Sequence, residues 1–171
     1  MSAKIERPRG THDVVPDEQP LWRHAIAEAE RLAVLYGYRP ILTPVFEDTA
    51  LFERTSGAGS DVVQKEMYTF EDRGGRSLTL RAEATAPICR AYVDHGMHRA
   101  PQPVKLYTIA PIHRYAAPQR GRFREHWQLS VEAIGSDDPA VDAEVIQLTD
   151  ALLTRLGLEA YSLELNSIGC R

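Results

Sequence analysis

The sequence predicts an α+β domain built on a mostly antiparallel sheet that is flanked by helices. Two long extended runs, 103–115 and 122–133, are separated by a segment with Pro and Gly turn residues, and two shorter runs are separated by Gly74-Gly75. Segments with helical periodicity lie between these pairs, but strands and helices do not alternate strictly. The order therefore favours antiparallel hairpins over a doubly wound parallel sheet.

The first predicted element is a helix over about residues 18–36. Asp17 can cap its start, Pro20 lies in the first turn, where proline is tolerated, and Gly37 follows as a C-terminal stop. The apolar residues at helical spacing are Trp22, Ile26, Ala29, Leu32, Ala33 and Tyr36. A short strand over 41–45 follows. Because Pro44 cannot donate a ladder hydrogen bond, we expect this strand at a sheet edge or between subunits.

A second hairpin is predicted from strands 67–70 and 77–81, because Gly74-Gly75 is a strong turn signal. A helix over about 84–94 comes next. It is followed by the large hairpin, in which a loop at 116–121 joins the two long strands.

A third helix is expected after the large hairpin, with Asp137 or Asp138 as its cap and Gly157 as its stop. Its apolar stripe consists of Val141, Val145, Leu148, Leu152 and Leu156. The last predicted element is a strand over 161–165.

Composition describes an ordinary globular chain. Its 171 residues correspond to one domain, and 43% are hydrophobic and 26% charged. The net charge of −4 gives no general attraction for nucleic acid. No apolar run has the length of a membrane span and no signal peptide is recognisable, so we expect a cytoplasmic protein with no membrane partner. Cys89 and Cys170 form no disulfide framework and are expected to be reduced thiols.

Polar side chains form one face of the second long strand. Four arginines fall within eleven positions without an acid among them, at Arg114, Arg120, Arg122 and Arg124. Alternate residues of a strand share a face, so Arg122, Arg124, His126, Gln128, Ser130 and Glu132 form one row, and Phe123, Trp127, Leu129, Val131 and Ala133 the other. The mixed chemistry of the first row indicates a polar pocket floor, and the alternative is an ordinary solvated strand face.

The ends of the large hairpin can bring Arg114 and Arg122 together. An arginine fork grips phosphate oxygens in pairs and keeps its charge, so these residues are candidates for binding an anionic ligand. The alternative is a basic surface hairpin that makes ordinary salt bridges. His95 and His98 share a helix face without further ligands, so no metal site is predicted.

The segment 81–85 is a second polar cluster, at the junction of a strand with a helix. Arg81, Glu83 and Thr85 could present polar atoms at the end of the sheet, where a helix N-terminus also lies. A carboxylate beside a hydroxyl suits an ammonium group. The alternative is a capping arrangement in which Glu83 and Thr85 satisfy the amides of the helix end.

Several spaced segments resemble histidyl-tRNA synthetase, a class II aminoacyl-tRNA synthetase. The resemblance extends over residues 9–169 and rests on Gln64-Lys65-Glu66-Met67-Tyr68-Thr69-Phe70, Leu78-Thr79-Leu80-Arg81-Ala82-Glu83-Ala84-Thr85 and Pro118-Gln119-Arg120-Gly121-Arg122-Phe123-Arg124, followed by Gln128-Leu129 and Glu132. It implies an antiparallel catalytic core in an obligate homodimer. The first helix and the strand ending at Pro44 resemble the dimer-forming motif 1, and the hairpin of Arg114 resembles motif 2.

The resemblance also implies roles for individual residues. The α-amino group of histidine would be held by Glu83, Thr85 and Gln128, and its imidazole by Glu132. Arg114 would contact the α-phosphate of ATP, with Arg122 nearby on the triphosphate and His126 at the adenine. Histidine would be activated with ATP and Mg²⁺ and then transferred to tRNA(His).

The sequence departs from the family pattern in three respects. Ala116 replaces a glutamate usual near the adenine, and His126 replaces a phenylalanine that stacks on the base. The chain is also less than half the usual length, so residues 1–171 are expected to be the N-terminal part of the catalytic domain, with motifs 1 and 2 and without motif 3 and the anticodon-binding domain. We expect no full aminoacylation from this part alone.

Two rival functions are open at this point. One is the non-catalytic regulatory subunit of ATP phosphoribosyltransferase, which acts in histidine biosynthesis and keeps the fold and part of the amino-acid pocket. The other is a nucleic-acid-binding module that uses the basic hairpin without chemistry, although the acidic balance of the chain disfavours it.

Overall fold

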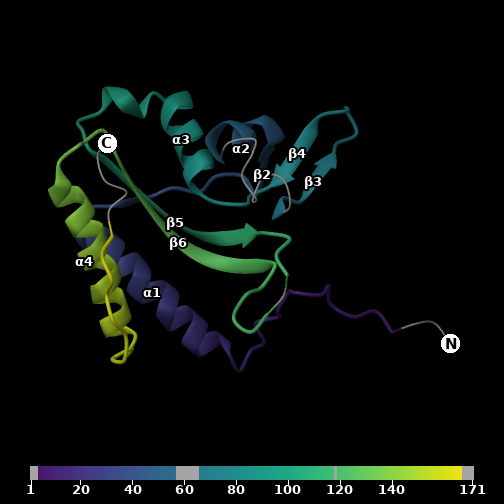
Figure 1. Cartoon of the computed structure of the whole chain (residues 1–171), viewed down its shortest axis with the longest axis horizontal. Helices are drawn as coiled ribbons and strands as arrows, with labels where there is room; N and C mark the ends of the chain where they lie inside the picture. Colours follow the sequence, from purple (N-terminus) through teal and green to yellow (C-terminus); the bar gives the residue numbers. More distant parts are fainter. Residues whose placement is uncertain (1–3, 57–65, 118, 167–171) are drawn as a thin grey trace.

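The structure is a computed structural model, and it describes residues 4–56, 66–117 and 119–166 (Figure 1). Its strands form two three-stranded sheets, in the orders β1-β5-β6 and β2-β4-β3. The larger sheet contains the long hairpin of β5 (Val104–His113) and β6 (Glu125–Ile134), which pair antiparallel, and the short β1 (Arg39–Pro40), which runs parallel to β5. The expected α+β class with mainly antiparallel pairing is confirmed.

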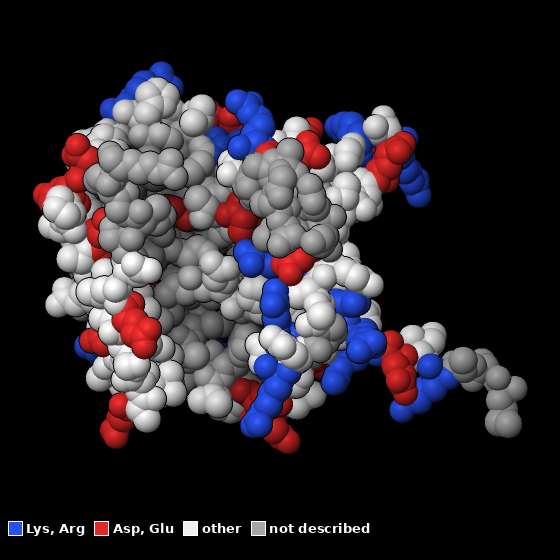
Figure 2. All heavy atoms as spheres, in the orientation of Figure 1, with Lys and Arg blue, Asp and Glu red and all other residues white. Residues whose placement is uncertain are grey.

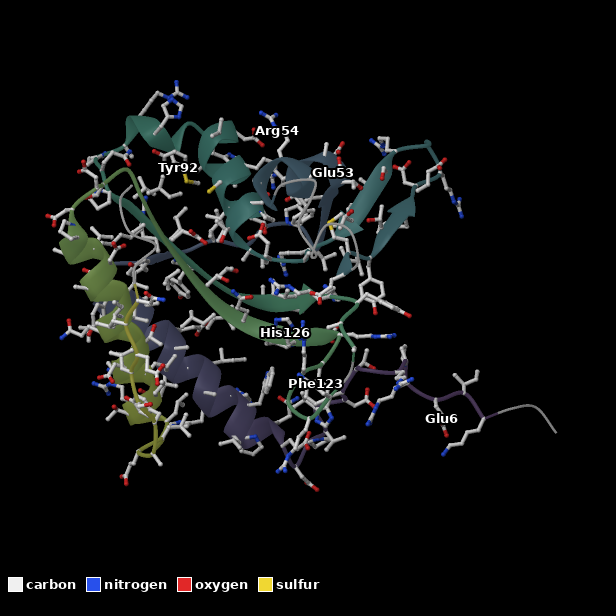
Figure 3. All side chains as sticks on the ribbon, in the orientation of Figure 1. Glu6, Glu53, Arg54, Tyr92, Phe123 and His126 are labelled. Carbon is white, nitrogen blue, oxygen red and sulfur yellow. The ribbon has the colours of Figure 1, made fainter. Side chains whose placement is uncertain are left out.

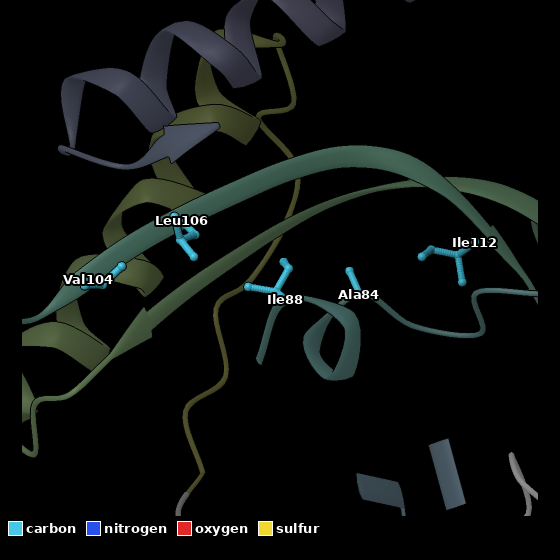
Figure 4. Packing of buried hydrophobic residues seen from close by; sticks show 5 residues of the cluster. All are labelled: Ala84, Ile88, Val104, Leu106 and Ile112. Atoms are coloured by element: carbon cyan, nitrogen blue, oxygen red, sulfur yellow. The ribbon is translucent and has the colours of Figure 1, made fainter. Parts of the chain in front are cut away.

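Helices cover both faces of the long hairpin (Figure 1). α3 (Thr85–Asp94) lies on one face, where Ala84 and Ile88 pack against Val104, Leu106 and Ile112 (Figure 4). α1 (Gln19–Leu35) and α4 (Pro139–Arg155) lie side by side on the opposite face. Apolar side chains therefore pack on both faces of the hairpin, which forms the centre of the fold.

The smaller sheet combines β2 (Phe46–Asp48), β3 (Thr69–Glu71) and β4 (Ser77–Leu80), all antiparallel. The predicted hairpin about Gly74-Gly75 is confirmed, and Gly75 has the positive φ of 76° that favours glycine in such a turn. The helix α2 (Thr49–Ser56), which follows β2, was not predicted.

The helices lie close to their predicted bounds, but the expected cap of α1 is wrong. The N-cap of α1 is Glu18 without a side-chain hydrogen bond, and the amides of Glu18 and Gln19 donate instead to the carbonyl of Val15. Asp138 does cap α4, accepting a hydrogen bond from the Ala140 amide at 2.9 Å. Gly37 and Gly157 follow α1 and α4 with positive φ, as expected for helix stops.

The predicted strand over 41–45 is wrong. The chain leaves the larger sheet after Ile41, whose amide donates to Tyr107, and joins the smaller sheet at Phe46. Between these points the carbonyls of Thr43 and Pro44 accept hydrogen bonds from the Arg81 guanidinium rather than from a neighbouring strand. The segment therefore crosses from one sheet to the other.

The predicted strand over 161–165 is also wrong. A strand needs a neighbour for its amides and carbonyls, and none of the described strands pairs with this segment. It is held by the Tyr161 hydroxyl, which donates to the Asp150 carboxylate at 2.6 Å. Some residues named in the sequence analysis lie outside the described residues, namely 64–65, Pro118, 167–169 and Cys170. Cys89 is a free thiol.

None of the helices within the described residues is long and apolar enough to cross a membrane.

Candidate functional site

The amino terminus of α3 is capped by a carboxylate that also faces the site. Glu83 accepts hydrogen bonds from the amides of Thr85 at 2.7 Å and Ala86 at 2.9 Å. A negative charge is favourable at this end of a helix. The structural alternative raised for Glu83, a cap on the helix amides, is therefore confirmed. Each oxygen of a carboxylate can accept more than one hydrogen bond, so the capping contacts leave capacity for a ligand.

Thr85 links this cap to the long hairpin. Its hydroxyl donates to the Glu132 carboxylate across 2.7 Å, which joins α3 to β6. Glu132 faces α3 because its partner on β5, Leu106, belongs to the apolar cluster beneath the helix. Burial raises the pKa of Glu132, the hydrogen bond from Thr85 lowers it, and the nearby carboxylate of Glu83 raises it further. Two carboxylates therefore lie beside Thr85, Glu83 on its amide and Glu132 on its hydroxyl, and a cation between them would be favoured.

Gln128 extends the polar row along β6. It pairs with Ala110, which is small and buried, and its own side chain is half-buried. The residues of alternate parity, Leu129, Val131 and Ala133, pack toward α1 and α4, and Trp127 contacts the ring of Trp22 with centroids 5.8 Å apart. The predicted separation of a polar row from a core row is therefore confirmed from His126 onward.

The three residues expected at ATP meet around one cavity. Arg114, Arg122 and His126 line a cavity of about 470 Å³ together with Ala116, Gly121, Phe123 and Trp127. Figure 3 marks His126 on β6 and Phe123 in the preceding loop. Figure 2 shows that Lys and Arg gather on this side of the molecule, over the loop and the N-terminal segment. The cavity therefore combines cationic and aromatic side chains.

Arg114 is anchored at both its backbone and its side chain. Its amide donates to the carbonyl of Arg124 at 2.8 Å, and its Nε donates to the carbonyl of Ala82 at 2.7 Å. Ala82 directly precedes the capping residue Glu83. The cationic end and the carboxylate end of the polar face are thus both attached to the segment 82–85, Arg114 through Ala82 and Glu132 through Thr85.

The other two cavity residues differ in charge and exposure. The pKa of His126 is lowered by burial and by electrostatic repulsion from Arg114 and His113, so its neutral ring is favoured near pH 7 and presents a flat face. Arg122 is about half exposed and donates to the Glu66 carboxylate at 3.0 Å. An exposed ion pair of this kind is weak, and an anionic ligand can replace Glu66 as its partner.

Arg124 does not belong to the converging row, which corrects the prediction. β6 begins at Glu125, so strand alternation does not extend back through the loop. The Arg124 guanidinium lies over the Tyr115 ring at 3.9 Å, and its amide donates to the carbonyl of Gly10 at 2.7 Å. Gly10 has a φ of 86°, and a Cβ there would lie 2.8 Å from Arg124 Cγ. Arg124 therefore holds the N-terminal segment against the hairpin.

Arg81 was also misjudged, because it presents no polar atom at the site. Its side chain is 2% exposed and donates to backbone carbonyls. Sequence reasoning equally missed Glu66 as the partner of Arg122. Strand parity could not reveal either contact, since each joins segments that are distant in the sequence. Within the described residues, no group of three or more His, Cys, Asp or Glu side chains could hold a metal ion.

Comparisons with known proteins agree on one family. The family model described as histidyl-tRNA synthetase matches residues 10–170. A curated histidine--tRNA ligase of Dehalococcoides mccartyi is 56% identical over 166 residues, which cover 97% of this chain and 40% of that protein. The chain thus spans about 40% of the length of this curated relative.

Solved structures give the same picture. The apo histidyl-tRNA synthetase of S. aureus matches with a TM-score of 0.77 and 40% identity, over 91% of this chain and 36% of that one. A Bacillus halodurans protein, described as an ATP phosphoribosyltransferase regulatory subunit/histidyl-tRNA synthetase, matches with a TM-score of 0.77 and 31% identity, over 93% and 40% of the two chains.

Proposed function

The chain belongs to the histidyl-tRNA synthetase family, and on that premise we propose that it forms the N-terminal part of the catalytic core of a histidine--tRNA ligase. Residues 1–171 would carry motifs 1 and 2 of a class II catalytic domain, and activity would belong to a longer protein that also supplies motif 3 and an anticodon-binding domain. The observation that carries the proposal is the attachment of Arg114 and Glu132 to one segment, at Ala82 and Thr85.

Histidine would occupy the carboxylate end of the polar face. Its ammonium group would bind between Glu83, Thr85 and Gln128, and the imidazole N–H would donate to Glu132. Glu132 is half-buried and its pKa is raised. A hydrogen-bond donor on the ligand would therefore stabilise its carboxylate by replacing the water that burial removes. An amino acid without such a donor would leave Glu132 unpaired, which supports selection of histidine.

ATP would occupy the cavity of Arg114, Arg122 and His126. Arg114 would meet the α-phosphate, Arg122 would exchange Glu66 for the triphosphate, and the neutral ring of His126 would stack on the adenine. The described lining of the cavity has no carboxylate and does not fit a Mg²⁺ site by itself. We infer that Mg²⁺ arrives on the nucleotide phosphates.

The reaction would then bring two anions together. The histidine carboxylate attacks the α-phosphorus, the bond to the β-phosphate oxygen breaks, and pyrophosphate leaves. The Arg114 guanidinium, fixed in place by Ala82, would stabilise the charge that develops on the α-phosphate. The ribose at the 3′ end of tRNA(His) would then attack the histidyl adenylate. The proposed enzyme would act as a homodimer through motif 1, in the cytoplasm.

Histidine-dependent exchange of pyrophosphate into ATP tests this proposal, measured on the full reading frame. We expect exchange in the wild type and a loss of about 100-fold or more in Arg114→Ala, because a phosphate-stabilising donor is removed. Arg73→Ala serves as the control, since Arg73 lies in the turn between β3 and β4, away from the cavity. Wild-type protein without exchange would contradict the ligase proposal.

The regulatory subunit of ATP phosphoribosyltransferase is a second candidate. It is favoured by the Bacillus halodurans match, whose description names both functions, and by Ala116, which places a methyl group in the lining of the cavity. The same assay separates the two candidates. Histidine binding without any exchange would support the regulatory subunit.

A further inference from the structure

Arg81 is one of the largest fully buried side chains, although it carries a charge. Its guanidinium donates to the carbonyls of Thr43 at 3.1 Å and Pro44 at 3.3 Å on one side, and to Pro111 at 3.0 Å on the other. Burial lowers the pKa of Arg81, and the Glu47 carboxylate opposes this effect. A buried cation held by neutral carbonyls is costly, so its geometry must serve the fold or the site.

The backbone of Arg81 joins the same two segments as its side chain. Its amide donates to Val45 at 2.8 Å, and its carbonyl accepts from the His113 amide at 2.9 Å. Segments 43–45 and 111–113 are therefore tied to one residue by both its main chain and its guanidinium. The fork of an arginine reaches both sides at once, which a lysine ammonium does not.

Arg114 adjoins this junction at two points, through its chain neighbour His113 and through the carbonyl of Ala82. His113, which bonds the Arg81 carbonyl, directly precedes Arg114, and Ala82, whose carbonyl holds the Arg114 Nε, directly follows Arg81. The histidine end is held differently. There α3 is fixed by the apolar packing of Ala84 and Ile88 on the hairpin, and its amides are capped by Glu83.

We propose that Arg81 is a positioning residue for Arg114: its bonds to segments 43–44 and 111 fix where the Arg114 guanidinium lies. Arg81 touches no substrate and acts through Ala82 and His113. The inference rests on the proposed function, because it takes ATP as the ligand of Arg114. It predicts that loosening Arg81 disturbs the ATP end of the site far more than the histidine end.

Calorimetric titration of the full reading frame with ATP and with histidine tests this inference. In Arg81→Lys we expect the Kd for ATP to rise about tenfold or more and the Kd for histidine to change less than about threefold, because small displacements of an anchoring group have large effects. Thermal unfolding of each variant checks that it folds. Thr43→Ala, which removes the hydroxyl 3.3 Å from the Arg81 guanidinium, is the milder second variant and should shift the same ratio in the same direction.

Arg90→Lys is the matched control. Arg90 also joins distant segments, donating to Glu47 at 2.6 Å and to Asp94 at 2.9 Å, but none of its hydrogen bonds within the described residues reaches Ala82 or His113, through which Arg81 acts on Arg114. We expect it to lower thermal stability while both ligand affinities stay within about twofold, since it loses only the fork geometry.

The outcomes separate the inference from the proposed function. Equal weakening of ATP and histidine in Arg81→Lys, or an unchanged affinity for ATP, would overturn the positioning role. A wild-type protein that binds ATP but shows no histidine-dependent exchange would contradict the ligase proposal, while the comparison of Kd values would still decide the role of Arg81. A wild type that does not bind ATP would overturn both.

Discussion

The charged form of Glu132 is disfavoured by its surroundings. Its half-buried carboxylate lies close enough to Glu83 for the two charges to repel, and only the hydroxyl of Thr85 offsets the burial. A carboxylate with a raised pKa stabilises the fold only while it is protonated. Its favourable contribution is present below the ordinary value of 4.5 and is lost as the pH rises through the elevated pKa of the folded state.

We therefore expect Glu132→Gln to raise the melting temperature near neutral pH, with the gain disappearing as the pH falls through the raised pKa toward 4.5. The same variant should weaken histidine binding by about 10- to 100-fold and ATP binding much less, because the lost hydrogen bond is to a charged acceptor. Thermal scans across pH and calorimetric titrations measure both effects. Glu159→Gln, at an exposed position, is the control. Equal losses for both ligands would count against the role of Glu132.

His126 is predicted to act as a neutral ring. Because burial, Arg114 and His113 lower its pKa below 6.5, its NMR titration should fall on the acid side of that value. We expect His126→Ala to weaken ATP binding by about tenfold and His126→Phe to restore it, since stacking on a base needs a flat face rather than a charge. Weaker binding in His126→Phe than in His126→Ala would refute stacking.

At the scale of elements, the stability of α4 depends on its first turn. Asp138 caps the Ala140 amide, so Asp138→Ala should lower the free energy of unfolding by about 1 kcal/mol. The neighbouring Asp137 is exposed and is not the N-cap. Asp137→Ala is the matched control and should change the free energy of unfolding by less than about 0.5 kcal/mol. Denaturant unfolding measures the difference. Equal effects of the two substitutions would place the cap elsewhere.

Elements with strong local signals could be predicted from the sequence, and elements that depend on distant partners could not. The hairpins and the helices α1, α3 and α4 follow from periodicity and turn residues. Segments 41–45 and 161–165 have strand-like sequences, but the first crosses between sheets to meet Arg81 and the second lacks a neighbouring strand in the described structure. Sequence alternation records which face a residue prefers and not which strand will pair with it.

The residues of the site also differ in how well their positions could be predicted from the sequence. From His126 to Glu132 the residues lie on a regular strand, so their shared face was predictable by counting. Arg124 lies in the loop before that strand, where counting fails, and its contacts with Tyr115 and Gly10 depend on the folded loop. Arg81 was misplaced for another reason, since nothing in its local sequence indicates that carbonyls from two distant segments surround it.

On the scale of the whole molecule, the crossover segment and the smaller sheet beside it expose large apolar side chains. Leu42 is 80% exposed, Val45 and Phe46 are about half exposed, and the ring of Phe46 meets that of Phe70 with centroids 6.3 Å apart. All four side chains leave apolar surface exposed, which association with a second subunit would cover. Leu42 lies in the segment ending at Pro44, which is expected to form the homodimer.

Leu42→Glu should therefore weaken self-association without unfolding the subunit, because the side chain is already exposed. Sedimentation equilibrium is expected to show dimer for the wild type and mostly monomer for the variant. Val93→Glu, at another exposed apolar position on α3, is the control and should remain dimeric. A monomeric wild type, or a dimer that tolerates Leu42→Glu, would contradict this assignment.

The central claim is that the arginine end and the carboxylate end of the polar face serve one ligand-binding site. The affinity of a non-hydrolysable histidyl-adenylate analogue, a single molecule that reaches both ends, tests it most directly by titration of the full reading frame. We predict that the analogue binds more tightly than histidine or ATP alone, and that Arg114→Ala and Glu132→Gln each weaken it by about tenfold or more. An affinity that only one of these substitutions changes would contradict a shared site.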